Sequence, residues 1–342
     1  MEQKKRPVIS VVMPAYNSGS VIEKALRSIR MQTIDQDLVE ILVIDGGSDD
    51  GTLAIARQYG ATVLHNEKRL PEHAKSIGLK RCLGQYAIMT DTDEEFTSPN
   101  QFSDRLALLR KHPQAKAVAA NRRIPAGNCG TAGRYMNIYE DPFTAVIYRL
   151  KETKLESFSK WIDSKEGNAV LLRYNENALT PIGDGATTML DMDYVRERFA
   201  DTYTSITFAC ISFLETVQAC GWYGCIEGDD VLHHSTCSLK VYLSKLRFRV
   251  INNLWHQEES GFTARAKINR KLARRKMLFP LYAVTIILPL LDSIKMAVRH
   301  KDATMLLHFF YVQYVFFYTA WCMMLKGFGK QKTNKTYGKQ PG

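Results

Sequence analysis

Two carboxylates stand one residue apart in the first third of the chain. Asp91 and Asp93 come directly after residues 86–90, a short apolar run that we expect to form a buried strand. Carboxylates this close repel one another unless a cation lies between them. Hard divalent cations take oxygen ligands, and substrate phosphates often complete their coordination. The triplet Asp91-Thr92-Asp93 therefore indicates a Mg²⁺ or Mn²⁺ ion that carries a diphosphate. The alternative, a solvated acidic turn, is disfavoured by the apolar strand before it.

Two further strand ends carry candidate binding residues. The apolar run 8–13 stops at Pro14-Ala15-Tyr16-Asn17, and the run 40–44 stops at Asp45, which Gly46 follows. Asp45 alone is equally compatible with a role as the N-cap of the next helix. In an open parallel sheet, ligands bind beyond the carboxyl ends of the strands. All three features therefore belong to one edge of the predicted sheet.

The elements that position these residues follow from the apolar periodicity. Residues 1–115 predict strands over 8–13, 40–44, 61–64 and 86–90 and helices over 20–32, 50–59 and 72–82. Further along, the pattern predicts strands over 118–120 and 186–190 and helices over 141–151, 193–199 and 206–220. This alternation with short connections predicts an α/β fold, with a mostly parallel sheet covered by helices on both faces.

Composition narrows the class of protein. The chain has 342 residues, 45% of them hydrophobic and 24% charged, which excludes a disordered, collagen-like or coiled-coil chain. A net charge of +11 predicts an acidic partner, such as nucleic acid, an anionic membrane surface or a phosphorylated substrate. The seven cysteines include no C-x-x-C pair, which indicates reduced thiols in the cytosol. The N-terminal sequence MEQKKRPVIS argues against a secretory signal.

The C-terminal third differs in kind. Residues 262–276 include seven basic side chains and no acidic one, and two apolar runs follow at 277–294 and 305–325. As helices these runs would be about 27 and 31 Å long, against a hydrocarbon core of about 30 Å. The second run is long enough to cross a membrane, whereas Pro280 and Pro289 interrupt the first.

A pair of core helices in a soluble domain is the alternative interpretation of these runs. They lack a polar face for water, so we expect a membrane-associated helical hairpin, either transmembrane or interfacial. The basic run contains no interleaved aromatic residues for stacking on bases, so an anionic lipid surface is expected in place of nucleic acid.

These patterns predict five regions. They are a nucleotide-binding subdomain (1–115), an acceptor-side subdomain (116–240), a basic amphipathic segment (241–276), the hairpin (277–326) and a basic tail (327–342).

A family resemblance accompanies the motifs at the strand ends. V-x-x-P-x-Y-N, V-I-D-x-x-S-x-D-G-T and G-x-Y-x-x-x-x-D-x-D occur in this order within residues 6–100, as in the inverting glycosyltransferases of family 2, which have the GT-A fold. A weaker match continues through Gly185, the helix that ends at Gly221, and V-L-H-H at 231–234.

The resemblance implies a nucleotide-sugar donor. It assigns the nucleobase to the first two strand ends, and the ribose and a Mg²⁺ or Mn²⁺ ion on the diphosphate to Asp91 and Asp93. His233 or His234 would approach the diphosphate or the metal. The donor-binding residues implied in this way are Pro14, Ala15, Tyr16, Asn17, Asp45, Gly46, Lys75, Asp91, Thr92 and Asp93.

The chain departs from the family pattern in two places. The family's A-R-N-x-G becomes Ala74-Lys75-Ser76-Ile77-Gly78, in which Lys75 still brings positive charge to a phosphate but not a bidentate fork. The family's Glu-Asp pair, whose Asp is the general base, aligns with Ala209-Cys210. Three explanations stay open: another carboxylate is the base (Asp201, Asp184 or Glu215), activity is lost, or the acceptor needs no base.

The expected reaction is an in-line displacement at the anomeric carbon that inverts its configuration. A polyprenyl phosphate acceptor is already anionic, so it needs no general base, and the hairpin suits such a lipid or a lipid-linked saccharide. We expect an enzyme of glycan or polysaccharide synthesis at the cytoplasmic face of the cell membrane, with no nucleic-acid partner.

Three other functions are the alternatives to this expectation. A membrane-tethered sugar-nucleotide-binding protein with impaired catalysis fits the missing base. A nucleotidyltransferase would carry a basic, Gly-rich loop after the first strand, where this chain has PAYNSGS. A phosphatase of the haloacid dehalogenase type would open with the D-T-D motif, which here follows three strands.

Overall fold

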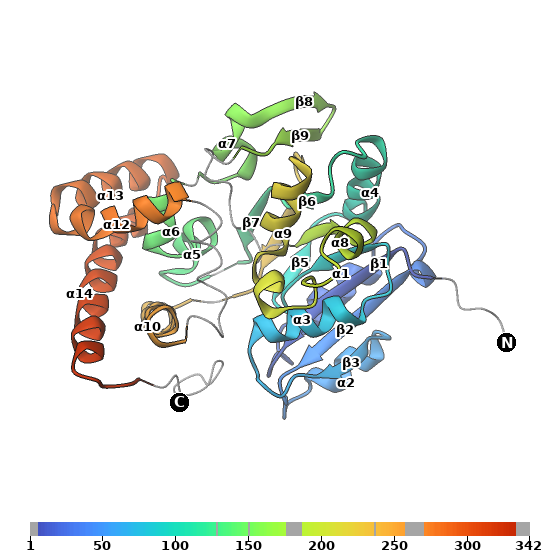
Figure 1. Cartoon of the computed structure of the whole chain (residues 1–342), viewed down its shortest axis with the longest axis horizontal. Helices are drawn as coiled ribbons and strands as arrows, with labels where there is room; N and C mark the ends of the chain where they lie inside the picture. Colours follow the sequence, from blue (N-terminus) through green and yellow to red (C-terminus); the bar gives the residue numbers. More distant parts are fainter. Residues whose placement is uncertain are drawn as a thin grey trace. The chain divides into compact units, whose positions relative to one another are not determined.

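The computed structural model describes residues 6–127, 129–149, 151–175, 187–235, 237–256 and 270–332, with the side chains of 270–273 left out. The chain divides into two compact units. The sheet unit comprises Met1–Ile124 and Thr153–His234, and the helical unit comprises Pro125–Glu152 and Ser235–Gly342. Each unit is described by itself below (Figure 1).

A nine-stranded sheet forms the sheet unit, in the order β3-β2-β1-β4-β10-β6-β11-β9-β8. The strands are β1 (Ile9–Ala15), β2 (Val39–Asp45), β3 (Thr62–His65), β4 (Tyr86–Met89), β6 (Ala117–Ala119), β8 (Ile162–Glu166), β9 (Ala169–Arg173), β10 (Thr188–Asp191) and β11 (Trp222–Ile226). The four predicted N-terminal strands pair in parallel, which confirms the parallel core. Beyond them, β10 runs antiparallel to both β4 and β6, so the whole sheet is mixed.

A second sheet of three strands adjoins the first in the same unit. It has the order β5-β12-β7, with β5 (Glu94–Phe96), β12 (Asp230–His233) and β7 (Arg122–Pro125). The sequence patterns predicted none of these strands, because each is short and pairs with a partner far away along the chain. β12 pairs antiparallel with β5 in the register His233↔Glu94, and this places the V-L-H-H segment beside the D-x-D turn.

Helices cover both faces of the large sheet. They are α1 (Ile22–Arg30), α2 (Thr52–Gln58), α3 (Pro71–Arg81), α4 (Gln101–Lys111), α7 (Lys154–Ser157), α8 (Met192–Arg198) and α9 (Ile206–Cys220), with short 3₁₀ helices at Gln36–Leu38 and Ser159–Trp161. Alternate residues of β1, among them Val11, pack with α1 and α4 in one apolar core. Val12 faces α3, and Gly78 allows this contact, since a Cβ there would lie 2.2 Å from the Val12 Cγ1.

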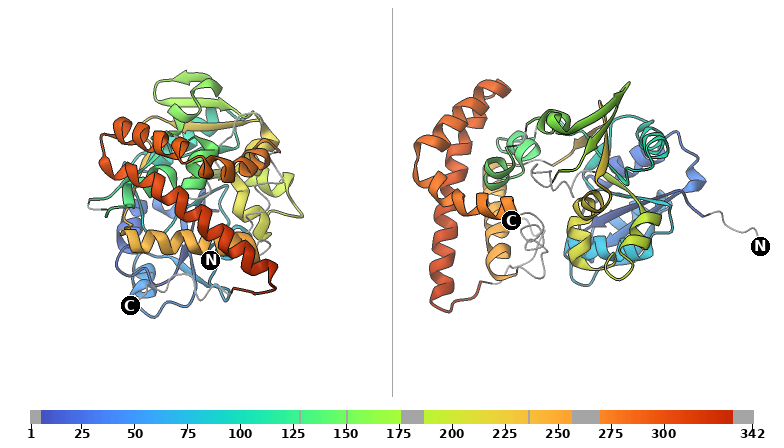
Figure 2. Two further views of the ribbon diagram at one scale, coloured as in Figure 1. Left: turned by 90° about the vertical axis from the view of Figure 1, so that its left-hand side faces the viewer. Right: turned by 45° about the horizontal axis from the view of Figure 1, so that its top comes forward.

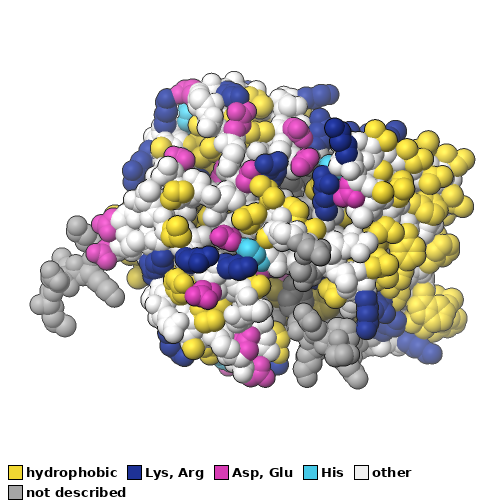
Figure 3. All heavy atoms as spheres, turned by 180° about the vertical axis from the view of Figure 1, so that it is seen from behind, with side chains coloured by type: hydrophobic (Ala, Val, Ile, Leu, Met, Phe, Trp, Pro, Cys, Tyr) yellow, Lys and Arg dark blue, Asp and Glu magenta, His cyan; other side chains and the backbone are white. Residues whose placement is uncertain are grey.

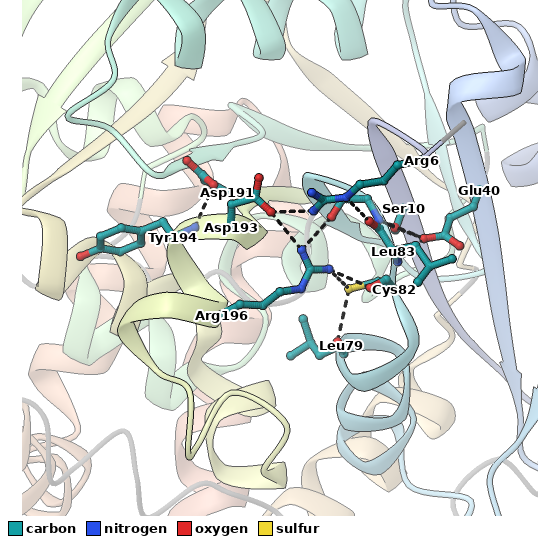
Figure 4. A network of polar contacts seen from close by, with 11 residues as sticks. Arg6, Ser10, Glu40, Leu79, Cys82, Leu83, Asp191, Asp193, Tyr194 and Arg196 are labelled. Carbon is teal, nitrogen blue, oxygen red and sulfur yellow. Dashed lines mark hydrogen bonds and ion pairs between the residues drawn. The ribbon is translucent and has the colours of Figure 1, made fainter. Parts of the chain in front are cut away.

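A polar network fixes the turn between α3 and β4 (Figure 4). The Arg196 guanidinium donates to the Cys82 carbonyl at 2.7 Å and to the Gly84 carbonyl at 3.1 Å. Asp193 binds both Arg196, at 3.3 Å, and Arg6, at 2.6 Å. α3 carries Lys75, and β4 leads into Asp91. This network therefore fixes the two elements that position these predicted site residues.

The helical unit contains α5 (Gly133–Tyr139), α6 (Pro142–Tyr148), α10 (Leu239–Trp255), α12 (Arg270–Val284), α13 (Ile287–His300) and α14 (Leu307–Gly327), with a 3₁₀ helix at Ala303–Leu306 (Figures 1 and 2). Its core joins aromatic and aliphatic side chains from these helices, with Tyr135, Tyr242 and Tyr311 in mutual ring contact. The predicted helix 141–151 is observed as α6, and residue 150 lies outside the described chain.

The membrane prediction needs correction in its details. In the part of the chain that the structure describes, no single helix is both long enough and apolar enough to cross a membrane. The run 305–325 forms the long helix α14, but polar groups such as His308 and Gln313 lower its hydropathy. One pair passes the test together, Arg274–Val284 with Ile287–His300, and it is bent by 96°. The bend lies at Thr285-Ile286, and Pro280 is accommodated inside α12.

Candidate functional site

The three predicted strand ends meet at one edge of the large sheet. The register Ala15↔Asp45 aligns the ends of β1 and β2, and the Gly46 amide donates to the Ala15 carbonyl at 2.8 Å. The Asn17 side chain accepts from the Asp49 amide at 3.0 Å, so the loop after β1 is bound to the loop after β2. Pro14 and Ala15 belong to β1 itself, which extends two residues beyond the predicted strand.

The third strand end joins the other two through a hydroxyl contact. Thr92 is buried, and its hydroxyl lies 2.9 Å from the Ser18 hydroxyl in the loop after β1. Ser18 also donates its amide to the Thr52 hydroxyl, at 2.7 Å, at the start of α2. Consequently the D-x-D turn and the loops after β1 and β2 form one connected surface at the carboxyl ends of the strands, as the sequence predicts.

Asp45 organises the loop that follows it. Its side chain is buried and accepts from the Gly47 amide at 2.8 Å and from the Ser48 amide at 3.0 Å. This arrangement is an Asx turn, and Gly47 adopts φ +90°, which suits glycine. Asp45 does not cap a helix, because α2 begins at Thr52, whose amide binds Asp50 at 2.9 Å. The N-cap alternative for Asp45 is therefore wrong.

Arg69 lies at the same edge, although the sequence analysis did not identify it. Its guanidinium carbon lies 5.5 Å from the centre of the Tyr16 ring, a cation–π contact. A Cβ on Gly46 would lie 3.3 Å from the Tyr16 ring, so this glycine lets the two loops approach. Arg69 follows β3 in a loop without a recognisable motif. The sequence indicated it only as a basic residue after a strand that is parallel to β1 and β2.

The D-x-D turn is built on a buried glutamate. Glu94 is fully buried and accepts from the Asp91 amide at 3.0 Å and from the Thr90 hydroxyl at 3.2 Å. Burial raises the pKa of Glu94, while the Arg123 guanidinium, 2.7 Å away, acts in the opposite direction. Glu94 and Arg123 thus form a structural support for the turn, and both were missed because nothing local in the sequence pairs residues 94 and 123.

The structure separates the two candidate histidines. His233 Nε2 lies 3.1 Å from an Asp93 carboxylate oxygen. His234 instead places Nε2 2.5 Å from the Glu95 carboxylate and Nδ1 3.4 Å from the Lys24 ammonium. His233 is the last residue of β12, and His234 follows the strand, with its backbone amide donating to the Asp93 carbonyl at 2.7 Å. His233 is therefore the histidine whose side chain lies against the D-x-D turn.

The side chains of Asp93 and His233 fit a divalent cation whose coordination a bound ligand would complete. Among the described residues, no group of three or more His, Cys, Asp and Glu side chains is arranged to hold a metal ion. Asp93 and His233 nevertheless bring a carboxylate oxygen and an imidazole nitrogen together, and Mn²⁺ and Mg²⁺ accept such ligands alongside phosphate and water oxygens. These residues suit a metal that arrives with a diphosphate.

Lys75 lies half-buried on α3, the helix that packs on β1 through Gly78. The adjacent Ser76 donates its hydroxyl to the Thr204 carbonyl at 2.5 Å, which joins α3 to the turn before α9. This contact fixes the position of α3 and of the lysine on it.

The predicted position of the general base is apolar. Ala209 and Cys210 are buried within α9, the helix that Ser205 caps and Gly221 ends with φ +82°. Asp201 lies exposed in the turn between α8 and α9, and Asp184 lies outside the described residues. Glu215 is half-buried on α9, and desolvation raises its pKa. α9 is observed over the predicted range, with a kink at Ile211, directly after this pair, where the backbone leaves helical geometry (φ −134°, ψ 21°).

Comparisons with known proteins agree with this geometry. The model of the family described as Glycosyl transferase family 2 matches residues 10–197. Glycosyltransferase AglE of Haloferax volcanii is 28% identical over 210 residues, 59% of this chain and 64% of that protein. The glucosyl-3-phosphoglycerate synthase of Petrotoga mobilis is 29% identical over 130 residues, 35% of this chain and 40% of that protein. The chain thus matches less than two thirds of the length of these relatives.

A solved structure supports the fold assignment. The mannosyltransferase PcManGT of Pyrobaculum calidifontis, in complex with GDP-Man and Mn²⁺, superposes with a TM-score of 0.50 and 17% identity, covering 93% of this chain and 88% of that one. At this identity the likeness concerns the fold, which is the GT-A-like arrangement of a parallel core with flanking helices. The family match covers more than half of the chain, and the chain therefore belongs to Glycosyl transferase family 2.

Proposed function

We propose that this protein is a metal-dependent inverting glycosyltransferase, which moves a sugar from a nucleoside diphosphate sugar to a polyprenyl phosphate or other lipid-linked acceptor in glycan synthesis. The observation that carries the proposal is the contact between Asp93 and His233 at the strand edge that also holds Tyr16 and Asp45. An imidazole and a carboxylate at such an edge suit a metal-bound diphosphate.

The nucleotide would lie across the ends of β1 and β2. Tyr16 offers a ring face to a base, and the buried Asp45 keeps the loop at Gly46 in place beside it. Pro14, Ala15 and Asn17 would shape the same surface, and Arg69 would add a guanidinium to it. PcManGT was solved with GDP-Man and Mn²⁺, and this supports a nucleoside diphosphate sugar as the class of donor.

The diphosphate would lie at the D-x-D turn. Asp93 and His233 would hold a Mg²⁺ or Mn²⁺ ion, and Asp91 would accept from the ribose, with Thr92 fixing the turn between them. When bound, the metal neutralises negative charge on the leaving nucleoside diphosphate. Lys75 on α3 would add positive charge to the same leaving group. The acceptor would attack from the opposite side of the anomeric carbon, which inverts its configuration.

The acceptor is inferred from the position of the missing base. A sugar hydroxyl loses a proton as it attacks, so a positioned base accelerates the reaction by about 10²–10⁴-fold. The phosphate of a polyprenyl phosphate is already anionic at neutral pH, because its second pKa is about 6. The apolar Ala209-Cys210 pair in α9 therefore favours a phosphate acceptor. Asp201 stays a candidate base for a hydroxyl acceptor.

The membrane location is part of the proposal. The seven cysteines form no disulfide among the described residues, in keeping with a reducing compartment. The bent apolar pair α12–α13 and the excess of basic residues in its unit favour the cytoplasmic face of the cell membrane.

One rival function is favoured by a specific observation. A sugar-nucleotide-binding protein without turnover would also have the strand-edge residues and lack the carboxylate at Ala209-Cys210. The two functions differ in whether a bound donor is consumed.

Two assays test the proposal. Thermal-shift screening against UDP-, GDP-, CMP- and dTDP-sugars with Mn²⁺ is expected to select one nucleobase. Transfer of the selected sugar is then measured to polyprenyl phosphate and to a lipid-linked saccharide. Turnover with polyprenyl phosphate supports the proposal, turnover only with the saccharide refutes the phosphate acceptor, and binding without turnover favours the rival function.

A further inference from the structure

The helical unit exposes many large apolar side chains on α12 and α13. Leu281 is 64% exposed, Ile286 55% and Ile287 66%, and these three surround the bend between the helices. Figure 3 shows the resulting apolar surface, with Lys and Arg side chains along its border. A soluble surface seldom exposes a continuous apolar area of this kind without a partner. We call residues Met277–Ile294, which contain the bend, the elbow.

The backbone at the elbow is prepared for an apolar environment. A helix end leaves carbonyl groups without helical partners, and such groups are costly in hydrocarbon. At the end of α12 the Thr285 hydroxyl donates to the Tyr282 carbonyl at 2.6 Å, and the Gln313 side chain donates to the Ala283 carbonyl at 3.0 Å. Two of the carbonyls at this helix end thus accept hydrogen bonds from side chains of the chain itself.

Polar contacts among α12, α13, α14 and α5 hold the bend. The Tyr282 hydroxyl of α12 donates to the Asp292 carboxylate of α13 at 3.0 Å, and it also lies 3.3 Å from Nε2 of His308. His308 in turn contacts the Tyr135 hydroxyl through Nδ1 at 2.6 Å. Ile286 adopts φ +57°, which is strained for a β-branched residue, so the surrounding contacts must impose it. These contacts show that the bend is stabilised by specific interactions within this unit.

Each arm of the elbow is shorter than one leaflet is thick. From Lys276 to Val284 the helix rises about 12 Å, and from Ile287 to Ile294 about 10 Å, at about 1.5 Å per residue. The hydrocarbon core is about 30 Å thick, so each leaflet contributes about 15 Å. Basic residues follow at both outer ends, Lys276 before α12 becomes apolar and Lys295 after Ile294. Neither arm can reach the opposite surface.

The charges around the elbow favour a bilayer over a second copy of the chain. Residues 270–332 contain eleven Lys and Arg against two Asp. Both aspartates are engaged, Asp292 with Tyr282 and Asp302 with Arg134 at 3.2 Å. Two copies that met through this surface would bring like charges together, whereas anionic headgroups are attracted by about 1 kcal/mol per basic residue.

We propose that the elbow is a re-entrant anchor, which inserts into one leaflet of an anionic bilayer and returns to the side that it entered. This proposal rests on the membrane location proposed above and specifies how the chain binds. The sequence left two modes of membrane association open, a transmembrane hairpin and an interfacial one. The re-entrant anchor is a third mode. Leu281, Ile286 and Ile287 lie deepest, and the basic residues at the outer ends of the arms contact the phosphates.

A matched pair of substitutions tests insertion. Leu281 and Met31 are equally exposed, at 64%, but Met31 lies at the end of α1 in the sheet unit. Full-length Leu281→Glu and Met31→Glu proteins are floated with phosphatidylcholine vesicles with and without phosphatidylglycerol. We expect Leu281→Glu to lower partitioning by at least about tenfold, because a charge at this depth is costly, and Met31→Glu to leave it unchanged. Phosphatidylglycerol should strengthen the binding of the parent protein.

Two outcomes would overturn insertion. One is vesicle binding by Leu281→Glu equal to that of the parent, with thermal melting showing that the variant is folded. The other is a parent that is dimeric without lipid and becomes monomeric on Leu281→Glu, which would make a second copy the partner. Donor binding in solution uses the soluble nucleotide sugar, so it tests the proposed function separately from this surface.

Labelling distinguishes the re-entrant mode from a span. Lys276→Cys and Lys301→Cys lie on either side of the elbow, and Leu281→Cys lies within it. In sealed vesicles a membrane-impermeant maleimide should label positions 276 and 301 from the same side and leave position 281 protected, after subtraction of the parent's native cysteines. Labelling of 276 and 301 from opposite sides would show a span, and labelling of 281 would show no insertion; either contradicts the proposal.

Discussion

The two units of this protein satisfy their buried polar groups in different ways. In the sheet unit the most buried polar contacts are ion pairs, such as Arg105 with Asp229, whose side chains are 0% and 2% exposed and 2.7 Å apart. In the helical unit they are neutral, such as Tyr135 with His308 at 2.6 Å and Tyr139 with His300 at 2.8 Å. The unit with the proposed diphosphate site is therefore also stabilised by buried ion pairs.

The difference follows the surface that each unit presents. Carboxylates and basic side chains of the sheet unit meet at a strand edge suited to a hydrated, metal-bound ligand. The helical unit exposes apolar side chains, and burial beneath them penalises charge. Its most buried polar pairs are therefore uncharged hydroxyl and imidazole groups, while the Asp141–Arg249 ion pair is partly exposed. The two units should therefore respond differently to the removal of a charge and to acid.

The largest effect is expected at the ligand edge of the sheet unit. Asp93→Ala removes the carboxylate that lies against His233, and kcat/KM for the metal-dependent reaction should fall about a thousandfold or more, because Asp93 would be a ligand of the proposed metal. Glu95→Ala, two residues along, removes a carboxylate that contacts His234 instead and should keep most of the activity. Steady-state kinetics with Mn²⁺ give the comparison, and an active Asp93→Ala enzyme would contradict the proposed metal site.

The charged interior of the sheet unit predicts a large loss of stability. Arg105→Met leaves Asp229 buried without its guanidinium, and the free energy of unfolding should fall by about 3–5 kcal/mol. Lys111→Met, on the same helix, removes an exposed ion pair with Glu166 and should cost less than about 1 kcal/mol. Urea denaturation measures both. Equal effects would mean that the buried pair is no more important than a surface pair.

The neutral interior of the helical unit predicts sensitivity to acid. Burial lowers the pKa of His308 to about 4, from 6.5. Between these values the unfolded state binds a proton that the folded state does not, so stability falls as pH drops from 6.5 to 4, by about 3 kcal/mol in total. His308→Gln should flatten this part of the pH profile of α14 hydrogen exchange, while His65→Gln, at an exposed position, should not. A profile unchanged by His308→Gln would contradict the assignment.

A smaller effect is expected from Arg69. Its guanidinium lies over the Tyr16 ring and beside Gly47, at the proposed nucleobase surface. Arg69→Ala should raise the donor KM by about tenfold, because the Tyr16 ring loses the guanidinium that packs against it, and it should leave kcat nearly unchanged. Arg57→Ala, on the exposed side of α2, is the control. A fall in kcat without a change in KM would place Arg69 elsewhere in the mechanism.

The sequence predicted the regions whose structure is determined locally. The strands over 8–13, 40–44, 61–64 and 86–90 were found with small shifts, because each is a short apolar run. The helix 206–220 was found with its predicted bounds, since Ser205 caps its start and Gly221 ends it. The D-x-D motif shared an edge with the other strand ends because parallel strands place their carboxyl ends together.

The remaining features depend on distant partners. Glu94 needs Arg123, and α4 contains the buried Gln101 and Arg105, whose partner Asp229 is more than a hundred residues away. The four residues of β10 contain no sequence pattern that indicates its antiparallel direction. The bend of the elbow lies at Thr285-Ile286, where contacts with Gln313 and Asp292 support it. The sequence instead predicted interruptions at Pro280 and Pro289. Such features require the fold before they can be recognised.

The most direct test of the metal site compares its two neighbouring histidines. Mn²⁺ binding to the full-length protein is measured by electron paramagnetic resonance in the presence of the nucleoside diphosphate that thermal-shift screening selects. His233→Ala should weaken Mn²⁺ binding by about 10–100-fold, and His234→Ala should leave it within a few-fold of the parent. Equal Mn²⁺ affinity in the parent and in His233→Ala would contradict the assignment of this edge as the site that grips the diphosphate.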